Sequence, residues 1–81
     1  MTDTEAFDRV RALLVNDFQV PADKVVPEAH LRVDLGLDSL SLTDLAFLVK
    51  QDLGLDGVTP DAFRGVTTVG LLSAFVATHA G

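Results

Sequence analysis

The sequence contains no cysteine, no tryptophan and no tyrosine among its 81 residues. Without cysteine the chain can form neither a disulfide framework nor a thiolate metal site. Its stability must therefore come from a packed core, which we expect to be aliphatic because 48% of the residues are hydrophobic and only 6% are aromatic. A chain of this length is near the lower size at which a domain folds without disulfides or metal sites, so we expect a single domain over residues 1–81.

Basic residues are also scarce, since 6 Lys and Arg stand against 12 Asp and Glu and give a formal net charge of −6. Most of this excess lies between residues 34 and 61, where six acids and one base, Lys50, give a net charge of −5. A protein that binds nucleic acid would need the opposite sign to neutralise phosphates, so that class is excluded. The acidic segment fits two uses equally well: docking on basic patches of partner proteins, or keeping the surface soluble.

Long hydrophobic runs are absent too, and no stretch approaches the roughly 20 apolar residues of a membrane-spanning helix. The stretch Met1–Glu5 is acidic and lacks the apolar region that follows the start of a signal peptide. We therefore expect no signal peptide, no membrane anchor and a location in the cytoplasm.

The first helix is predicted from a capping box and a periodic apolar face. Thr2 and Glu5 have the spacing of that box, and the helix is expected to end near Phe18 because Pro21 cannot continue it. The residues at helical spacing on its apolar face are Ala6, Phe7, Val10, Leu13, Leu14 and Phe18.

Two more helices are predicted near the end of the chain. Residues 59–65 resemble a short helix, with Thr as its cap, Pro at its first position and Gly just after its end; a turn over 55–58 precedes it. Either Thr67 or Thr68 is expected to cap the last helix. The residues on one face of that helix are Val69, Leu72, Phe75, Val76 and His79.

Residues 19–37 have no helical period. Leu31, Val33, Leu35 and Leu37 alternate with less apolar residues, which is the period of a strand. A strand is rejected because no other segment offers a partner, and a lone strand leaves its backbone unpaired. We expect instead a long ordered loop, held against the helices by Val25, Val26, Leu31, Val33 and Leu35. Together with a helix over residues 39–53, which follows this loop, these elements predict an all-α fold. The fold is expected to be a small antiparallel four-helix bundle of three main helices and one short helix.

A further helix is predicted over residues 39–53. Asp38 is placed to accept hydrogen bonds from its first turn as an N-cap, and Ser39 brings a hydroxyl to the positive end of its dipole. Gly54 suits a left-handed cap at the other end. Leu40 and Phe47 are expected to face outward. The core-facing stripe is expected to contain Leu42, Leu45, Ala46, Val49 and Leu53.

Catalytic chemistry is not predicted. A nucleophilic Ser39 would need a base and an orienting group, and neither His30 nor His79 has a spacing that brings it to this serine. The histidines and carboxylates lack metal-ligand spacing, and there is no glycine-rich loop that would cradle a phosphate. The sequence therefore indicates a protein that is not an enzyme.

The string Asp34-Leu35-Gly36-Leu37-Asp38-Ser39-Leu40 resembles the phosphopantetheine attachment motif of acyl carrier proteins. The resemblance extends from the first helix to the last and includes the string over residues 66–70. It implies that Ser39 receives 4′-phosphopantetheine covalently from coenzyme A through a phosphopantetheinyl transferase. Magnesium is then bound only in the transferase, where Asp38 helps to position the serine and the metal. The thiol of the arm would carry acyl groups as thioesters between enzymes of fatty-acid, polyketide or related biosynthesis.

The resemblance also implies a monomer whose second helix contacts acyl-loading enzymes, ketosynthases or other biosynthetic enzymes, with no nucleic acid and no membrane among its partners. The expected partner-binding residues are Leu40, Thr43, Asp44, Phe47, Lys50 and Gln51.

This sequence departs from carriers of fatty-acid synthesis, which usually have an acid where Ser41 stands and further acids near Lys50 and Gln51. The departure favours a dedicated carrier of a bacterial polyketide or related specialised pathway. Two alternatives stay open: an aminoacyl or peptidyl carrier, although these more often have Gly-Gly before the residue that precedes the serine, and an unmodified acidic helical interaction module.

Overall fold

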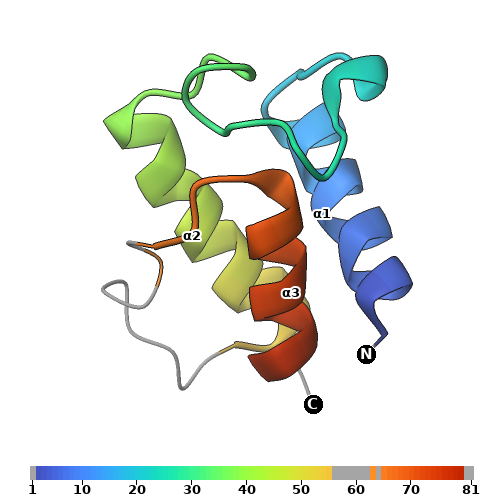
Figure 1. The fold of residues 1–81 in the computed structure, drawn as a ribbon. Helices are drawn as coiled ribbons and strands as arrows, with labels where there is room; N and C mark the ends of the chain where they lie inside the picture. The colour runs from blue at the N-terminus through green and yellow to red at the C-terminus, as the bar shows by residue number, and fades with distance from the viewer. Residues whose placement is uncertain (1, 56–62, 64, 80–81) are drawn as a thin grey trace.

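The computed structural model describes residues 2–55, 63 and 65–79. These residues form three helices, α1 (Asp3–Asp17), α2 (Ser39–Leu53) and α3 (Val69–His79), with a 3-10 turn, η1 (Ala22–Lys24), between α1 and α2. Figure 1 shows α1 running in the direction opposite to α2 and α3. The prediction of a small all-α bundle is confirmed, and the described part of the chain contains no strand. The turn and short helix predicted over 55–65 fall mostly on residues 56–62 and 64, outside the described residues.

The helix ends follow the local signals. The Thr2 hydroxyl accepts a hydrogen bond from the Glu5 amide at 3.1 Å and caps α1. Thr68, and not Thr67, caps α3, because its hydroxyl accepts from the Leu71 amide at 3.1 Å. Gly54 ends α2 in the left-handed conformation, with φ of 74°. None of the described helices has both the length and the hydropathy to cross a membrane.

The core lies where the apolar faces of the three helices meet. In α1 the buried residues are four of the predicted face, whereas Phe7 and Phe18 are half-buried at its margin. In α2 only Leu45, Val49 and Leu53 of the predicted core-facing stripe are buried, whereas Leu42 and Ala46 are half-buried. The helical residues that are fully enclosed include Leu14, Val10, Val49, Val69, Leu72 and Val76.

The long loop does not pack as the alternation predicted. Val25 and Leu31 are buried and Leu35 is half-buried, but the predictions for Val26 and Val33 are wrong, since these side chains are 43% and 79% exposed. Val26 begins a turn of its own, in which its carbonyl accepts from the Ala29 amide at 3.0 Å. For Val33 the physical reason is that residues 31–35 coil into another turn. Two amides, of residues 34 and 35, donate to the His30 carbonyl at 2.9 and 3.1 Å. A coiled segment places residues four apart on one side, so Leu31 and Leu35 face inward and Val33 faces outward.

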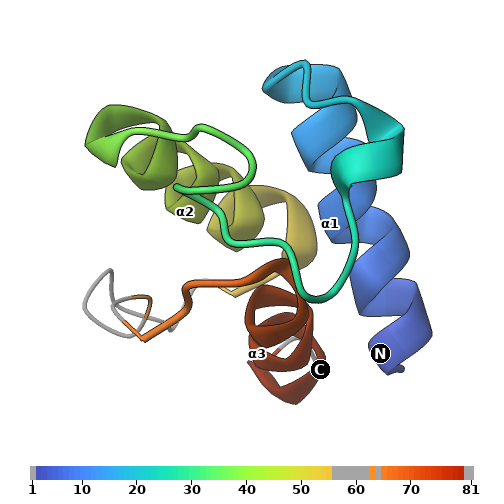
Figure 2. The same ribbon diagram turned by 45° about the horizontal axis from the view of Figure 1, so that its top comes forward.

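The loop also has a backbone partner that the sequence did not reveal. His30 and Thr68 form an isolated antiparallel bridge. On either side of it, the Leu31 amide donates to the Thr67 carbonyl at 2.9 Å and the Val69 amide donates to the Ala29 carbonyl at 3.0 Å. Figure 2 shows the loop passing beside the start of α3. The rejection of a strand was right, but the premise that no segment could pair with this one was wrong. This pairing ties the segment before α2 to α3.

Candidate functional site

The site is the junction between the loop and α2. Gly36, with φ of 73°, lies in a conformation that favours glycine and turns the chain towards the helix. Asp38 follows in extended conformation as the N-cap, and its carboxylate accepts from the Ser41 amide at 2.8 Å. Its carbonyl accepts from the Leu42 amide at 2.9 Å and begins the helical hydrogen bonds. Ser39 is thereby the first residue of α2, and it is exposed.

The hydrogen bonds from Ser41 also set the charge of the cap. The backbone N–H of Ser41, with a smaller contribution from its hydroxyl, lowers the pKa of the Asp38 carboxyl below its ordinary value. The carboxylate is therefore ionised at neutral pH and is fixed in orientation beside Ser39.

The chain has three serines, and their environments differ. Ser73 is 5% exposed and donates its hydroxyl to the Val69 carbonyl at 2.9 Å. Ser41 is half-buried and contacts the Asp38 cap. Ser39 alone is exposed, at the positive end of a helix dipole that favours a phosphate ester. The geometry therefore fits covalent attachment of a phosphate-linked group at this serine.

Neither histidine is placed to activate Ser39. The Nδ1 atom of His30 accepts from two loop amides, those of Arg32 and Val33. His79 lies in the last turn of α3, where its Nδ1 bonds the Phe75 carbonyl at 2.9 Å and its ring stacks on Phe75 with centroids 4.3 Å apart. No cluster of three metal-ligating side chains occurs within residues 2–55, 63 and 65–79. The described residues thus supply a hydroxyl and a fixed carboxylate but no base for that hydroxyl.

The predicted partner-binding residues form the outward side of α2. Leu40 is 72% exposed and Phe47 is 64% exposed, and seven residues separate them, which is close to two helical turns. Asp44 and Gln51 are exposed as well, whereas Lys50 is half-buried. Thr43 is exposed, and its hydroxyl donates to the Ser39 carbonyl at 2.9 Å.

A small cavity lies on the inner side of α2. Its volume is about 60 Å³. The residues that line it come from the loop, α2, the segment before α3 and α3 itself, and are Leu31, Leu42, Leu45, Ala46, Phe63, Val66 and Leu72. Sequence periodicity identified three members of this set as core residues of α2, but no signal in the sequence assigned Phe63 and Val66 to the same cavity.

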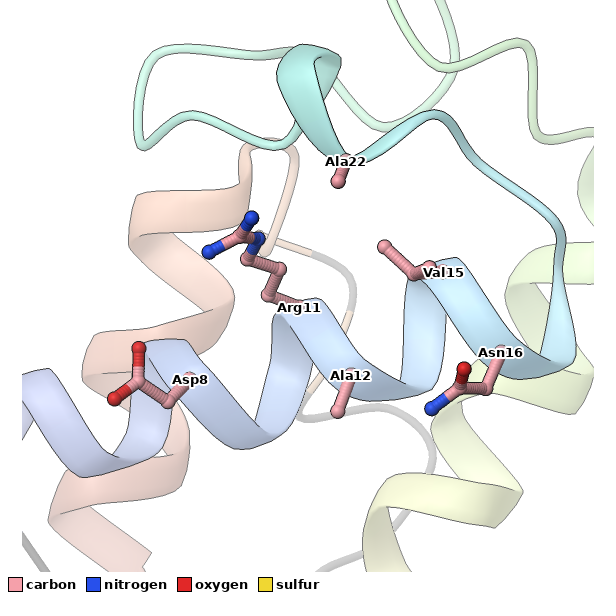
Figure 3. Close-up of a pocket in the computed structure, with 6 residues that line it drawn as sticks. All are labelled: Asp8, Arg11, Ala12, Val15, Asn16 and Ala22. Atoms are coloured by element: carbon pink, nitrogen blue, oxygen red, sulfur yellow. The ribbon is translucent and has the colours of Figure 1, made fainter.

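A second hollow lies apart from α2. It is a groove between α1 and η1, and Figure 3 shows Arg11 and Val15 extending from α1 and Ala22 facing them from η1. Asp8, Ala12 and Asn16 complete its lining, which contains none of the predicted site residues.

The comparisons with known proteins identify the family. A sequence model of the phosphopantetheine attachment site matches residues 8–76, which is most of the chain. The chain belongs to the acyl carrier family. The match includes the whole string from Asp34 to Leu40, so the resemblance noted above is confirmed.

Curated relatives agree with this assignment. Acyl carrier protein 2 of Ralstonia nicotianae is 39% identical over 70 residues, which cover 86% of this chain and 85% of that protein. An acyl carrier protein of Saccharopolyspora erythraea is 36% identical, over 86% of this chain and 73% of the other, and one of Picosynechococcus sp. is 31% identical, over 95% and 94%. The solved structure of the acyl carrier protein from Enterococcus faecalis has the same fold, with a TM-score of 0.77 at 23% identity, and covers 98% of this chain and 99% of that one.

Family membership decides the chemistry in outline. The protein is a carrier and not a catalyst, and its cofactor is covalently attached 4′-phosphopantetheine. When bound, this group supplies the thiol that carries acyl chains as thioesters, a function for which the chain has no cysteine of its own. A phosphopantetheinyl transferase and biosynthetic enzymes are its partners.

Proposed function

We propose that Ser39 is the residue that receives 4′-phosphopantetheine, and that the protein is a single-domain acyl carrier over residues 1–81. The observation that carries this proposal is the exposure of Ser39 at the start of α2, since the two other serines are half-buried or buried. Ser39 Oγ would attack the phosphorus of coenzyme A that bears the pantetheine, with release of 3′,5′-ADP. The hydroxyl proton would pass to a base of the transferase, because His30 and His79 bond elsewhere.

Asp38 is the second residue of the proposed site. Its carboxylate is held on the Ser41 amide and is ionised, so it presents a negative charge beside the reacting hydroxyl. This arrangement suits the role that the family resemblance implies, which is to position the serine and the magnesium ion in the transferase.

Intact mass spectrometry tests this assignment directly. The protein is incubated with coenzyme A, magnesium and a broad-specificity phosphopantetheinyl transferase. A gain of one phosphopantetheinyl unit is expected for the wild type and for Ser41→Ala, and no gain for Ser39→Ala. Retention of the gain in Ser39→Ala would refute the assignment, and its loss in Ser41→Ala as well would then assign the attachment to Ser41.

The outward side of α2 is the surface that we propose for partner enzymes. Leu40 and Phe47 would supply exposed apolar contacts, with Thr43, Asp44, Lys50 and Gln51 around them. Large exposed side chains with charge nearby suit recognition of a basic partner surface. We further propose that the protein acts as a monomer in the cytoplasm, where coenzyme A and its biosynthetic enzymes are available. Light scattering coupled to size exclusion would measure the oligomeric state.

For the pathway, we infer a dedicated carrier of polyketide or related specialised biosynthesis. Ser41, Lys50 and Gln51 reduce the negative charge of α2 where fatty-acid carriers are more acidic. The acyl alternative is favoured over the aminoacyl one because the relatives are named acyl carrier proteins. Crosslinking of the loaded arm to a polyketide and to a fatty-acid ketosynthase, side by side, tests this inference, and preference for the fatty-acid enzyme would overturn it.

A further inference from the structure

The loop that leads to Ser39 is capped by a histidine in an unusual way. The Nδ1 atom of His30 accepts hydrogen bonds from the amides of Arg32 at 3.1 Å and Val33 at 3.2 Å. In return, the carboxylate of Asp34 accepts from the His30 amide at 2.7 Å. The His30 side chain thus accepts from amides inside the turn over residues 31–35, and the Asp34 side chain accepts from the amide just before the turn. The two members of a capping box divide the backbone amides in the same way. Ser, Thr, Asp or Asn is the usual residue at a position of this kind.

This arrangement requires a neutral ring. An imidazole nitrogen accepts a hydrogen bond only through its lone pair, so the proton of the neutral ring is on Nε2. In the protonated ring both nitrogens are donors, and Nδ1 would then point a hydrogen at the Arg32 and Val33 amides. These two amides would lose their acceptor, and the half-buried ring would have to turn away from them.

We propose that His30 is a positioning residue whose protonation loosens the turn before Ser39 and thereby makes loading of the carrier sensitive to pH. The turn is continuous with the attachment site, because the Leu37 amide donates to the Leu31 carbonyl at 3.1 Å and residue 38 is already the cap of α2. Histidine is the side chain that changes charge within the physiological range. The effect on loading rests on the proposed attachment at Ser39, whereas the effect on the turn does not.

The groups around the ring do not replace the lost acceptor. Across the bridge, the segment before α3 contributes Thr67 and Thr68, which do not titrate. Of the charged residues on the loop, Asp34 shares a surface groove with Lys24 and Glu28, and Arg32 lies in the turn itself. The carboxylate of Asp34 faces the start of the turn, where it is bonded to backbone and not to the ring. That carboxylate already accepts from the His30 amide, so it does not take over the amides of residues 32 and 33.

His30→Asn is the matched variant, because its side-chain oxygen is an acceptor at every pH used and Asn is a favoured cap. His79 is present in both proteins, so its contribution to the pH dependence is the same in each. The rate of transferase modification is measured for both between about pH 8 and about pH 5.5, a range that spans the ordinary titration of histidine. We expect the ratio of wild type to His30→Asn to fall by about fivefold across the range, the factor that corresponds to one net hydrogen bond. A ratio that stays constant would overturn the proposal.

Amide hydrogen exchange of the unmodified protein provides a second readout. The protection factors of the Arg32 and Val33 amides should fall with acidification in the wild type and stay constant in His30→Asn, while the Val49 amide in the core should not respond in either. Equal behaviour of the two proteins would overturn the role of His30 even if loading varies with pH. If neither protein is modified at any pH, the attachment at Ser39 fails, and the exchange data still decide whether the histidine holds the turn.

Discussion

The amide of Gly70 donates a hydrogen bond of 2.9 Å to the carbonyl oxygen of Pro27, and a Cβ atom added to Gly70 would lie 2.9 Å from that same oxygen. A side chain at residue 70 therefore cannot coexist with this contact unless backbone moves. The contact extends the pairing between the loop and α3 by one more hydrogen bond, beyond the His30–Thr68 bridge. Glycine is required here by close approach and not by an unusual φ angle.

We predict that Gly70→Ala destabilises the protein, although alanine is the better helix former. Overpacking against a backbone carbonyl costs typically about 1–3 kcal/mol, while the gain in helix propensity is about 1 kcal/mol. The expected net loss is up to about 2 kcal/mol in the free energy of unfolding, measured by urea denaturation. Gly65→Ala is the control, since a Cβ there meets no atom within 4 Å. Equal stability of the two variants would show that the loop yields at Pro27 without cost.

A second prediction concerns the acid stability that Asp38 provides. Because the Ser41 amide lowers the pKa of this carboxyl in the folded protein, the ionised cap stabilises the fold above the unfolded pKa, which is ordinarily about 3.9. That contribution declines as the pH approaches this value and is lost as the pH falls through the lower folded pKa. Asp38→Asn keeps a capping oxygen that does not titrate.

The wild type should therefore lose stability relative to Asp38→Asn on acidification, as measured by urea midpoints over a pH series. Asp44→Asn, which removes a carboxylate from α2 without removing its cap, is the control for net charge. If the difference in urea midpoint between Asp44→Asn and the wild type changes with pH in the same way, the loss of stability comes from overall charge and not from the cap.

How far the sequence predicts this structure depends on the range of the interactions. Thr2, Asp38 and Gly54 mark helix ends through contacts within four residues, so their roles could be read directly from the sequence. The position of Ser39 at the start of α2 could be predicted in the same way, because this serine follows its cap immediately. The inward and outward sides of α2 were predicted by its period.

The loop was predicted less well, because the contacts that shape it are either unusual or distant. The exposure of Val33 depends on the turn capped by His30, and histidine is not a residue from which a cap is normally inferred. The pairing of His30 with Thr68 joins segments 38 positions apart, and no local pattern in the sequence signals it. The cavity behind α2 likewise combines residues from the loop to α3.

A third prediction follows from the volume of that cavity. At about 60 Å³ it is well below the engineered cavity of about 150 Å³ that holds benzene, so without expansion of the bundle it can shelter only a short acyl segment. Ala46, one of its half-buried lining residues, faces the space, and Ala46→Leu would occupy part of it.

We expect a short acyl group on the arm to raise the melting temperature of the wild type above that of the unacylated carrier, and to give no such rise in Ala46→Leu. Thermal unfolding followed by circular dichroism measures both. A substitution of similar size at Ala74, which is exposed on α3, serves as the control and should retain the rise. If Ala46→Leu keeps the full rise, the acyl group is not sheltered in this cavity.

The last prediction concerns Phe47, which is 64% exposed on α2. Because most of its side chain is exposed, Phe47→Ala should change the free energy of unfolding by no more than about 0.5 kcal/mol. If it anchors a partner enzyme, the same change should reduce transfer of the acyl group to a ketosynthase by about tenfold or more, which corresponds to about 1.4 kcal/mol. Leu71→Ala, at a residue 48% exposed on α3, removes a comparable apolar side chain from another part of the surface and should leave transfer unchanged. Initial rates of transfer from the loaded carrier, measured over a range of carrier concentrations, separate a defect in binding from a defect in chemistry. If Phe47→Ala transfers the acyl group as fast as Leu71→Ala does, Phe47 is not an anchor for the partner enzyme.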